Sequence, residues 1–219
     1  MFRLQPNDDI VKFINRMHLY KYMEQDWHVM NPWWEGKSFE TGISRPKYLE
    51  QLKKNLPLKE VIFLSGLRRI GKTTLLRQLI SHLLASVDPN TILYLTLDFL
   101  PLRGKTLHEL LNSFREIHGH GRQKKLYLFL DEITALPSFE QELKNLYDLE
   151  NVKVYASSSS ASLLKSKNSA LVGRSRIVEV LPLDFDEFLL FKNKVVKKDE
   201  QYLLKTYAED FLRLGGLPE

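Results

Sequence analysis

One stretch of the sequence constrains the fold more than any other. Residues 61–65 read VIFLS, a short unbroken run of strand-forming residues, which is typical of a strand covered on both faces. This run leads directly into the loop GLRRIGKTTLL, residues 66–76. Apolar residues then recur at helical spacing, at Leu75, Leu76, Leu79, Ile80, Leu83 and Leu84. The pattern predicts a strand, a tight loop with two glycines, and a helix that begins near Gly71 and Lys72.

The alternation of strand and helix patterns continues along the chain. Further strands are predicted at 92–97, 126–130, 152–156 and 177–180, and helices at 106–117, 139–149, 185–191 and 201–214. Another helix start is predicted at 44–52, with Pro46 in its first turn. Such alternation indicates an α/β fold, in which helices cover both faces of a mainly parallel sheet. The expected architecture is a three-layer sandwich with a small helical extension.

The glycine loop matches the pattern GxxxxGK[ST], and it lies between a strand and a helix, as a phosphate-binding loop (P-loop) does. Glycines let the backbone turn tightly, and successive N–H groups at the helix start attract anions. Lys72 is expected to bridge the terminal phosphates of a nucleotide, and the Thr73 hydroxyl to bind Mg²⁺. For Arg68 and Arg69 we expect side chains that face solvent. The alternative is contact with phosphate or with a neighbour. The candidate phosphate-binding residues are Gly66, Leu67, Arg68, Arg69, Ile70, Gly71, Lys72, Thr73 and Thr74.

A second motif, LYLFLDE, ends in an acidic pair at the carboxyl end of a predicted buried strand. Read alone, Asp131 and Glu132 equally fit the beginning of a turn. Together with the phosphate loop, they suggest that Asp131 holds Mg²⁺ and that Glu132 orients or deprotonates the water that attacks the γ-phosphate.

Two further polar groups follow along the chain. The serine run 157–160 either caps local structure or brings a hydroxyl toward the γ-phosphate, because its strand should neighbour the acidic strand. Gly173 precedes Arg174, a candidate for the arginine that stabilises the transferring phosphoryl group, and Arg176 lies close by.

Composition excludes several classes of site and location. The 219 residues include no cysteine, so disulfides and thiolate metal sites are absent. His118 and His120 lack further ligands at suitable spacing, and we discard a metal site there. The sequence shows neither a signal peptide nor a run long enough to span a membrane, and an intracellular location without membrane partners is expected. A net charge of +5 permits contact with nucleic acid. The densest basic cluster comprises Lys192, Lys194, Lys197 and Lys198.

Several motifs together resemble the archaeal-type AAA-like P-loop ATPases, relatives of the origin-recognition and signal-transducing NTPases. The resemblance covers residues 43–219 and rests on SRPKYLEQL, GLRRIGKTTLL, LYLFLDEI, ASSSSASLL, LVGRSR, LPLDFDEFL and GGLPE. It implies a P-loop NTPase fold, ATP binding and hydrolysis with Mg²⁺, Ser157 as polar sensor, and Arg174 as the arginine of the GR motif, acting in its own site or in that of an associated copy. It also implies that Arg45 and Pro46 lie near the adenine.

The sequence departs from the family pattern at the sensor. Family members usually carry Thr-Gly-Ser where this chain has Ser157-Ser158-Ser159, so Ser159 is an equal candidate. We expect the chain to divide into an aromatic-rich arm at 1–42, an ATPase core at 43–182 and a helical lid or incomplete further domain at 183–219. The arm is expected to pack on its own domain, with a partner or ligand surface as the alternative.

Three functions remain open at this point. The first is an ATPase whose hydrolysis drives a conformational or assembly change. The second is a DNA-binding or protein-binding module that ATP gates without appreciable hydrolysis. The third is a small-molecule kinase, although the adjacent Asp131 and Glu132 favour water as the acceptor.

Overall fold

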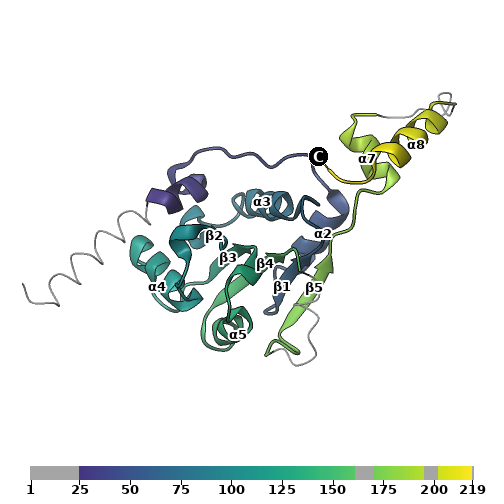
Figure 1. Cartoon of the computed structure of the whole chain (residues 1–219). Coiled ribbons are helices and arrows are strands. Elements are labelled where there is room, and N and C mark those ends of the chain that lie inside the picture. The colour runs from purple at the N-terminus through teal and green to yellow at the C-terminus, as the bar shows by residue number, and fades with distance from the viewer. Residues whose placement is uncertain (1–24, 161–169, 195–201, 219) are drawn as a thin grey trace, which may run out of the picture.

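The fold was analysed in a computed structural model that describes residues 25–160, 170–194 and 202–218 (Figure 1). The strands are β1 (Val61–Ser65), β2 (Ile92–Thr96), β3 (Leu126–Asp131), β4 (Val152–Ser158) and β5 (Ser175–Glu179). The α-helices are α2 (Pro46–Lys54), α3 (Lys72–Leu83), α4 (Leu107–His118), α5 (Phe139–Leu149), α7 (Phe185–Phe191) and α8 (Tyr202–Leu214). The short 3-10 helices are η1 (Pro32–Glu35), η2 (Pro89–Thr91), η3 (Leu100–Leu102) and η4 (Ile133–Ala135).

The five strands form one sheet in the order β2-β3-β4-β1-β5. Every neighbouring pair is parallel. The carboxyl ends of all strands therefore meet at one edge, where ligands of such sheets usually bind. Strand β4 lies between β1 and β3, with Leu64 opposite Ser157 and Leu130 opposite Ala156. This order places the serine run between the phosphate loop and the acidic pair.

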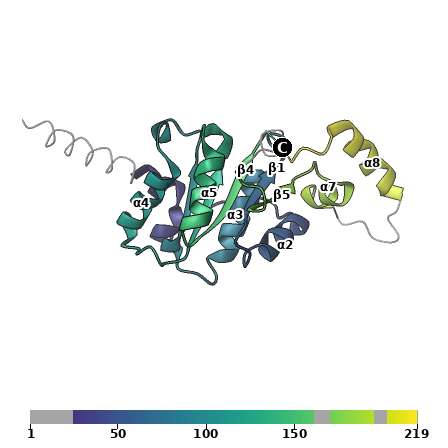
Figure 2. The same ribbon diagram turned by 90° about the horizontal axis from the view of Figure 1, so that it is seen from below.

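The sheet lies between two layers of helices, as Figures 1 and 2 show. Alternate residues of each strand face opposite layers, so β1 contributes Ile62 and Leu64 to one core and Val61 and Phe63 to the other. One core includes residues of α2 and α3, and the other includes residues of α4 and α5. Because both faces are covered, all five residues of β1 are buried, and this explains its unbroken apolar sequence.

The segment before α2 covers the edge strand β2. The Asn31 side chain accepts a hydrogen bond from the Tyr94 backbone N–H at 2.6 Å and donates to the Tyr94 carbonyl at 3.0 Å. The indole N–H groups of Trp33 and Trp34 donate to the carbonyl of Ile92 at 3.2 and 2.8 Å. These bonds satisfy backbone groups that an edge strand would otherwise expose. The described part of the aromatic arm therefore packs on its own domain.

Helices α7 and α8 form a pair that extends from the β5 side of the sheet (Figure 1). Phe211 of α8 packs against Phe185 and Phe188 of α7, with ring centroids 5.8 and 5.2 Å apart. After α8 the chain turns back, and the carbonyl of Gly216 accepts a hydrogen bond from the Leu183 N–H at 2.7 Å. The segment 215–218 thus returns toward the body of the domain.

The structure confirms the three-layer α/β sandwich with a parallel sheet, and it shifts several predicted boundaries by one or two residues. One shift matters for the site, because β4 continues through Ser157 and Ser158 instead of ending at residue 156. The division at residues 42 and 182 stays a prediction. Lys197, Lys198 and the aromatic residues of the arm before residue 25 lie outside the described residues. Within the described part of the chain, no helix combines the length and the apolar character that a membrane crossing needs.

Candidate nucleotide-binding site

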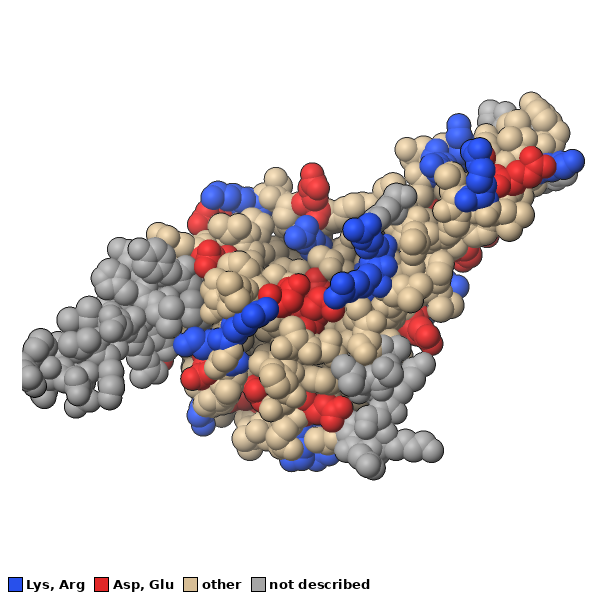
Figure 3. Space-filling view, viewed as in Figure 1, with Lys and Arg blue, Asp and Glu red and all other residues tan. Residues whose placement is uncertain are grey.

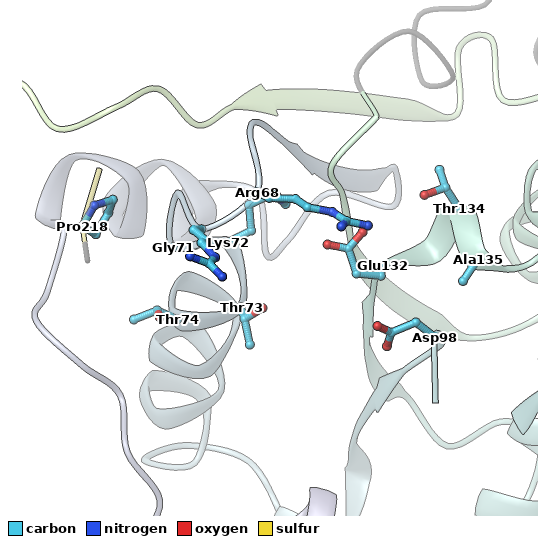
Figure 4. A pocket seen from close by; sticks show the side chains of 11 residues that line it. Arg68, Gly71, Lys72, Thr73, Thr74, Asp98, Glu132, Thr134, Ala135 and Pro218 are labelled. Carbon is cyan, nitrogen blue, oxygen red and sulfur yellow. The ribbon is translucent and has the colours of Figure 1, made fainter. Parts of the chain in front are cut away.

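A cavity of about 760 Å³ opens at the carboxyl edge of the sheet, above the start of α3 (Figure 4). Its lining includes the predicted loop residues together with Glu132. The lining residues are Arg68, Arg69, Gly71, Lys72, Thr73, Thr74, Asp98, Glu132, Thr134, Ala135 and Pro218. Motifs that lie far apart in the sequence are therefore assembled around one space.

The two glycines of the loop serve different physical needs. Gly71 caps α3 with φ of 92°, a left-handed conformation that glycine adopts without steric cost. Gly66 has ordinary φ, but a Cβ atom built there would lie 2.4 Å from the carbonyl oxygen of Val180. The close passage of the chain after β5 therefore excludes a side chain at Gly66. The sequence motif predicts both glycines, but the need for Gly66 comes from a neighbouring segment as well as from any phosphate.

Lys72 lies at the first position of α3, and its amine donates to three oxygen atoms. It bonds to the carbonyls of Gly66 and Leu67 at 3.0 and 2.8 Å and to the Ser159 hydroxyl at 3.0 Å. Burial lowers the pKa of the Lys72 amine, while the charges of Glu132 and Asp131 oppose that shift. The amine is therefore held inside the loop by weak neutral acceptors, which a phosphate oxygen would outcompete.

The carboxylate of Asp131 accepts three hydrogen bonds at the end of β3. Oδ2 accepts from the Thr73 hydroxyl at 2.6 Å and from the Tyr94 hydroxyl at 2.9 Å. Oδ1 accepts from the Ser157 hydroxyl. Thr73 and Asp131 offer the oxygen donors that Mg²⁺ prefers. Among the described residues, no three histidine or acidic side chains cluster as a metal cage.

Glu132 follows Asp131 and has φ of 50°, a strained conformation for a residue with a side chain. The Ser157 hydroxyl accepts its backbone N–H at 3.0 Å, and the Ser159 hydroxyl donates to its Oε1 at 2.8 Å. Arg69, inside the loop, also has positive φ. Figure 4 shows the Arg68 side chain extending toward Glu132 along the rim of the cavity. Arg68 and Arg69 are both exposed, as expected, and both also line the cavity.

The structure separates the two serines that the sequence leaves as alternatives. Ser157 is fully buried and bonds to Asp131 and to the Glu132 N–H. Ser159 lies beyond the end of β4 and bonds to the side chains of Lys72 and Glu132. Ser157 thus orients the acidic pair from within the sheet, and Ser159 lies between the two groups expected to face the γ-phosphate.

Arg45 is buried and differs in its surroundings from the expectation of an adenine contact. Its guanidinium pairs with Glu187 of α7 at 2.7 Å and donates to the carbonyls of Ile70 and Leu181 at 3.3 and 3.0 Å. It still touches a smaller cavity of about 180 Å³, which Gly71, Thr74 and Pro218 also line. Pro46 is exposed and lines none of the cavities described here. Through these bonds, Arg45 connects the phosphate loop to α7. Its expected contact with the adenine base stays a prediction.

Arg174 does not join the site of its own chain, which corrects one of the two arrangements left open by the sequence. Its carbonyl accepts the Val61 N–H at 2.9 Å, so it lies at the amino end of β1 and β5. The phosphate loop begins at the opposite end of β1, roughly 16 Å away for five strand residues. The Arg174 side chain bonds to Asp148 at 3.0 Å. A role of Arg174 in the site of an associated copy stays a prediction.

Three residues of the site escaped the sequence analysis. Pro218 reaches the loop from the carboxyl side of the described chain, where a built Cβ of Gly71 would lie 4.0 Å from its ring. Asp98 lines the 760 Å³ cavity and an adjoining one of about 590 Å³. Tyr94 binds Asp131 from the neighbouring strand. In the sequence, Pro218 belongs to the GGLPE motif, and Asp98 is an acidic residue just past the predicted strand 92–97, where ligands of parallel sheets gather.

Comparison with known proteins agrees with this geometry. Residues 58–189 match the family described as AAA domain. Uncharacterized protein MJ1637 of Methanocaldococcus jannaschii is 34% identical over 209 residues, which cover 84% of this chain and 43% of that protein. The chain spans between 34% and 44% of the length of the curated relatives that it matches.

Two solved structures show the same fold at low sequence identity. The Walker-type ATPase PABY2304 of Pyrococcus abyssi has a TM-score of 0.52 at 20% identity, covering 80% of this chain and 64% of its own. The ORC1 protein of Aeropyrum pernix, solved in complex with DNA, has a TM-score of 0.51 at 16% identity, covering 77% of this chain and 50% of its own. Because the family match covers more than half of the sequence, the chain belongs to the AAA domain family, and it has the fold of the P-loop ATPases.

Proposed function

We propose that this chain binds ATP with Mg²⁺ and hydrolyses it to ADP and phosphate, and that the cycle drives a conformational or assembly change. The observation that carries the proposal is that Lys72, Thr73 and Glu132 line one cavity, with Ser159 bonded to both Lys72 and Glu132 and with Asp131 bonded to Thr73. Membership of the AAA domain family supports the same chemistry.

The chain's own residues would divide the work as follows. The loop amides and Lys72 bind the phosphates, and Thr73 and Asp131 hold Mg²⁺. When bound, the ion neutralises charge on the phosphate oxygens. Glu132 takes the proton of the attacking water, and Ser159 fixes the carboxylate that does so. Pro218 and Arg45 flank a smaller cavity next to the loop, where the base would extend.

The test is a steady-state ATPase assay combined with nucleotide binding by calorimetry. Lys72→Ala should lose both binding and turnover, because it removes the ammonium that faces the phosphates. Glu132→Gln should keep binding and lose turnover by about 10²-fold or more, the usual contribution of a general base. Lys54→Ala and Glu116→Gln, both at exposed helix positions away from the cavity, are matched controls. ATP turnover equal to that of the wild type in both site variants would show that this site does not hydrolyse ATP.

A second candidate function is a DNA-binding module that ATP gates. Lys and Arg side chains gather on the α7–α8 pair in Figure 3, and Lys192 and Lys194 are exposed there. The similar ORC1 structure contains DNA. Duplex affinity measured by fluorescence anisotropy should then fall steeply as salt rises, because bound counterions are released, and should change with ATP. A flat salt response, or the same affinity with and without ATP, argues against this function.

A further inference from the structure

Tyr94 is the donor to Asp131 that sequence motifs do not predict. It is the third residue of β2, 5% exposed, and its hydroxyl donates to Asp131 Oδ2 at 2.9 Å. The phenol O–H is a hydrogen-bond donor, and this geometry directs it at one oxygen of the carboxylate.

The bond from Tyr94 differs in kind from the other bond to the same oxygen. Oδ2 also accepts from Thr73, but Thr73 lines the 760 Å³ nucleotide cavity and its hydroxyl is the one expected to face Mg²⁺. Tyr94 does not line that cavity; it lines the adjoining 590 Å³ cavity, which Thr73 and Asp131 line as well. Because Thr73 alone of the two donors also faces the nucleotide cavity, nucleotide binding would change the partners of Thr73 and leave the Tyr94 bond in place.

The backbone of Tyr94 is held by the segment that covers the edge of the sheet. Asn31, which is fully buried, makes hydrogen bonds to both the N–H and the carbonyl of Tyr94. Without Asn31 these edge groups would have no partner in the sheet, because β2 pairs only with β3. The Arg77 guanidinium lies over the Tyr94 ring, 6.0 Å from its centre.

We infer that Tyr94 is a positioning residue for the magnesium carboxylate, and that Asn31 makes the N-terminal segment part of the metal site through it. The Tyr94 hydroxyl fixes one Asp131 oxygen so that the carboxylate meets the ion in one orientation. This inference rests on the proposed function, because it needs a chain that binds nucleotide with Mg²⁺. Groups that orient metal ligands in this way typically change metal affinity by about 10-fold to 100-fold.

The experiment compares nucleotide affinity with and without Mg²⁺ by calorimetry, using ADP and either MgCl₂ or EDTA. The dissociation constant in EDTA divided by that in MgCl₂, here called the magnesium ratio, measures how strongly the ion couples to nucleotide binding. Tyr94→Phe keeps the ring and removes only the hydroxyl, so the ratio should fall about 10-fold while affinity in EDTA stays at the wild-type value.

The matched control is Tyr155→Phe. Tyr155 is also buried in the sheet, on the same face as Tyr94, and its hydroxyl donates to a backbone carbonyl, that of Leu52, at 2.8 Å. Removing either hydroxyl costs one buried hydrogen bond, but Tyr155→Phe should leave the magnesium ratio unchanged. Unfolding curves in urea show whether both variants are folded under the conditions of the titration.

A second variant tests the role assigned to Asn31. Asn31→Ala should lower the magnesium ratio in the wild-type background and produce no further loss in Tyr94→Phe, because it acts through Tyr94. A Tyr94→Phe ratio equal to the wild type, or additive losses in the double variant, would overturn the inference. A wild-type chain with no Mg²⁺-dependent binding would instead overturn the proposed function, so the two failures are distinguishable.

Discussion

Single residues divide the candidate site into groups that face the phosphates and groups that orient them. Ser159 bonds to the side chains of Lys72 and Glu132, whereas Ser157 is buried and bonds to Asp131 and to backbone. A hydrogen bond to a charged group contributes about 1.5–3 kcal/mol, which corresponds to about 10-fold to 100-fold in rate. Ser159→Ala should therefore lower kcat by that factor with little change in the urea midpoint of unfolding.

The neighbouring serine gives the contrasting outcome. Ser157→Ala leaves a buried carboxylate oxygen and the Glu132 N–H without their partner, and should cost about 1–3 kcal/mol of unfolding free energy as well as activity. The two measurements together, kcat and the urea midpoint, assign a role to each serine. A Ser159→Ala variant with wild-type kcat, beside an inactive but stable Ser157→Ala, would make Ser157 the group that faces the γ-phosphate.

At the scale of elements, one buried ion pair connects helix α7 to the phosphate loop. Glu187 completes the capping box of α7 with Asp184 and also pairs with Arg45, which in turn donates to the carbonyl of Ile70 in the loop. Arg45→Met leaves the buried Glu187 without its cation and should destabilise the chain by about 3–5 kcal/mol. The loop should lose order with it, so nucleotide affinity should fall in parallel. Urea unfolding and calorimetry measure the two effects.

Two further variants make the element-scale prediction specific. Glu187→Gln in the Arg45→Met background removes the unpaired charge while keeping an amide oxygen for the helix cap, and should recover part of the lost stability. Arg176→Met removes an exposed pair with Glu60 and should change stability little. Equal losses for Arg45→Met and Arg176→Met would show that burial of the Arg45 pair does not decide its contribution.

At the scale of the whole molecule, the sequence predicts the strands and helices but misses the contacts between segments that lie far apart in the chain. Strand and helix positions follow from periodicity, and the placement of β4 beside β3 follows from where polar motifs end strands. The contacts of Asn31 with Tyr94, of Arg45 with Glu187, and of Pro218 with Gly71 join segments between 63 and 147 residues apart. No local period or spacing encodes such pairs, because they arise only when layers pack.

The arrangement of the sheet also separates Arg174 from the site of its own chain. It lies at the amino ends of β1 and β5, while the loop lies at the carboxyl ends. If Arg174 contributes to hydrolysis, it acts on a second copy, and turnover per chain should rise with protein concentration. Arg174→Ala should lower kcat by about 10³-fold or more, in the range of supplied arginines.

Mixing two inactive variants tests this arrangement directly. Lys72→Ala keeps Arg174 but cannot bind phosphate, and Arg174→Ala keeps the loop but lacks the arginine; a mixture should regain activity because one copy completes the site of the other. Arg176→Ala, two residues away and paired with Glu60 on the surface, should stay active alone. A mixture no more active than the sum of its parts, or full activity of Arg174→Ala alone, would leave Arg174 as the partner of Asp148 and give self-association no role in the chemistry.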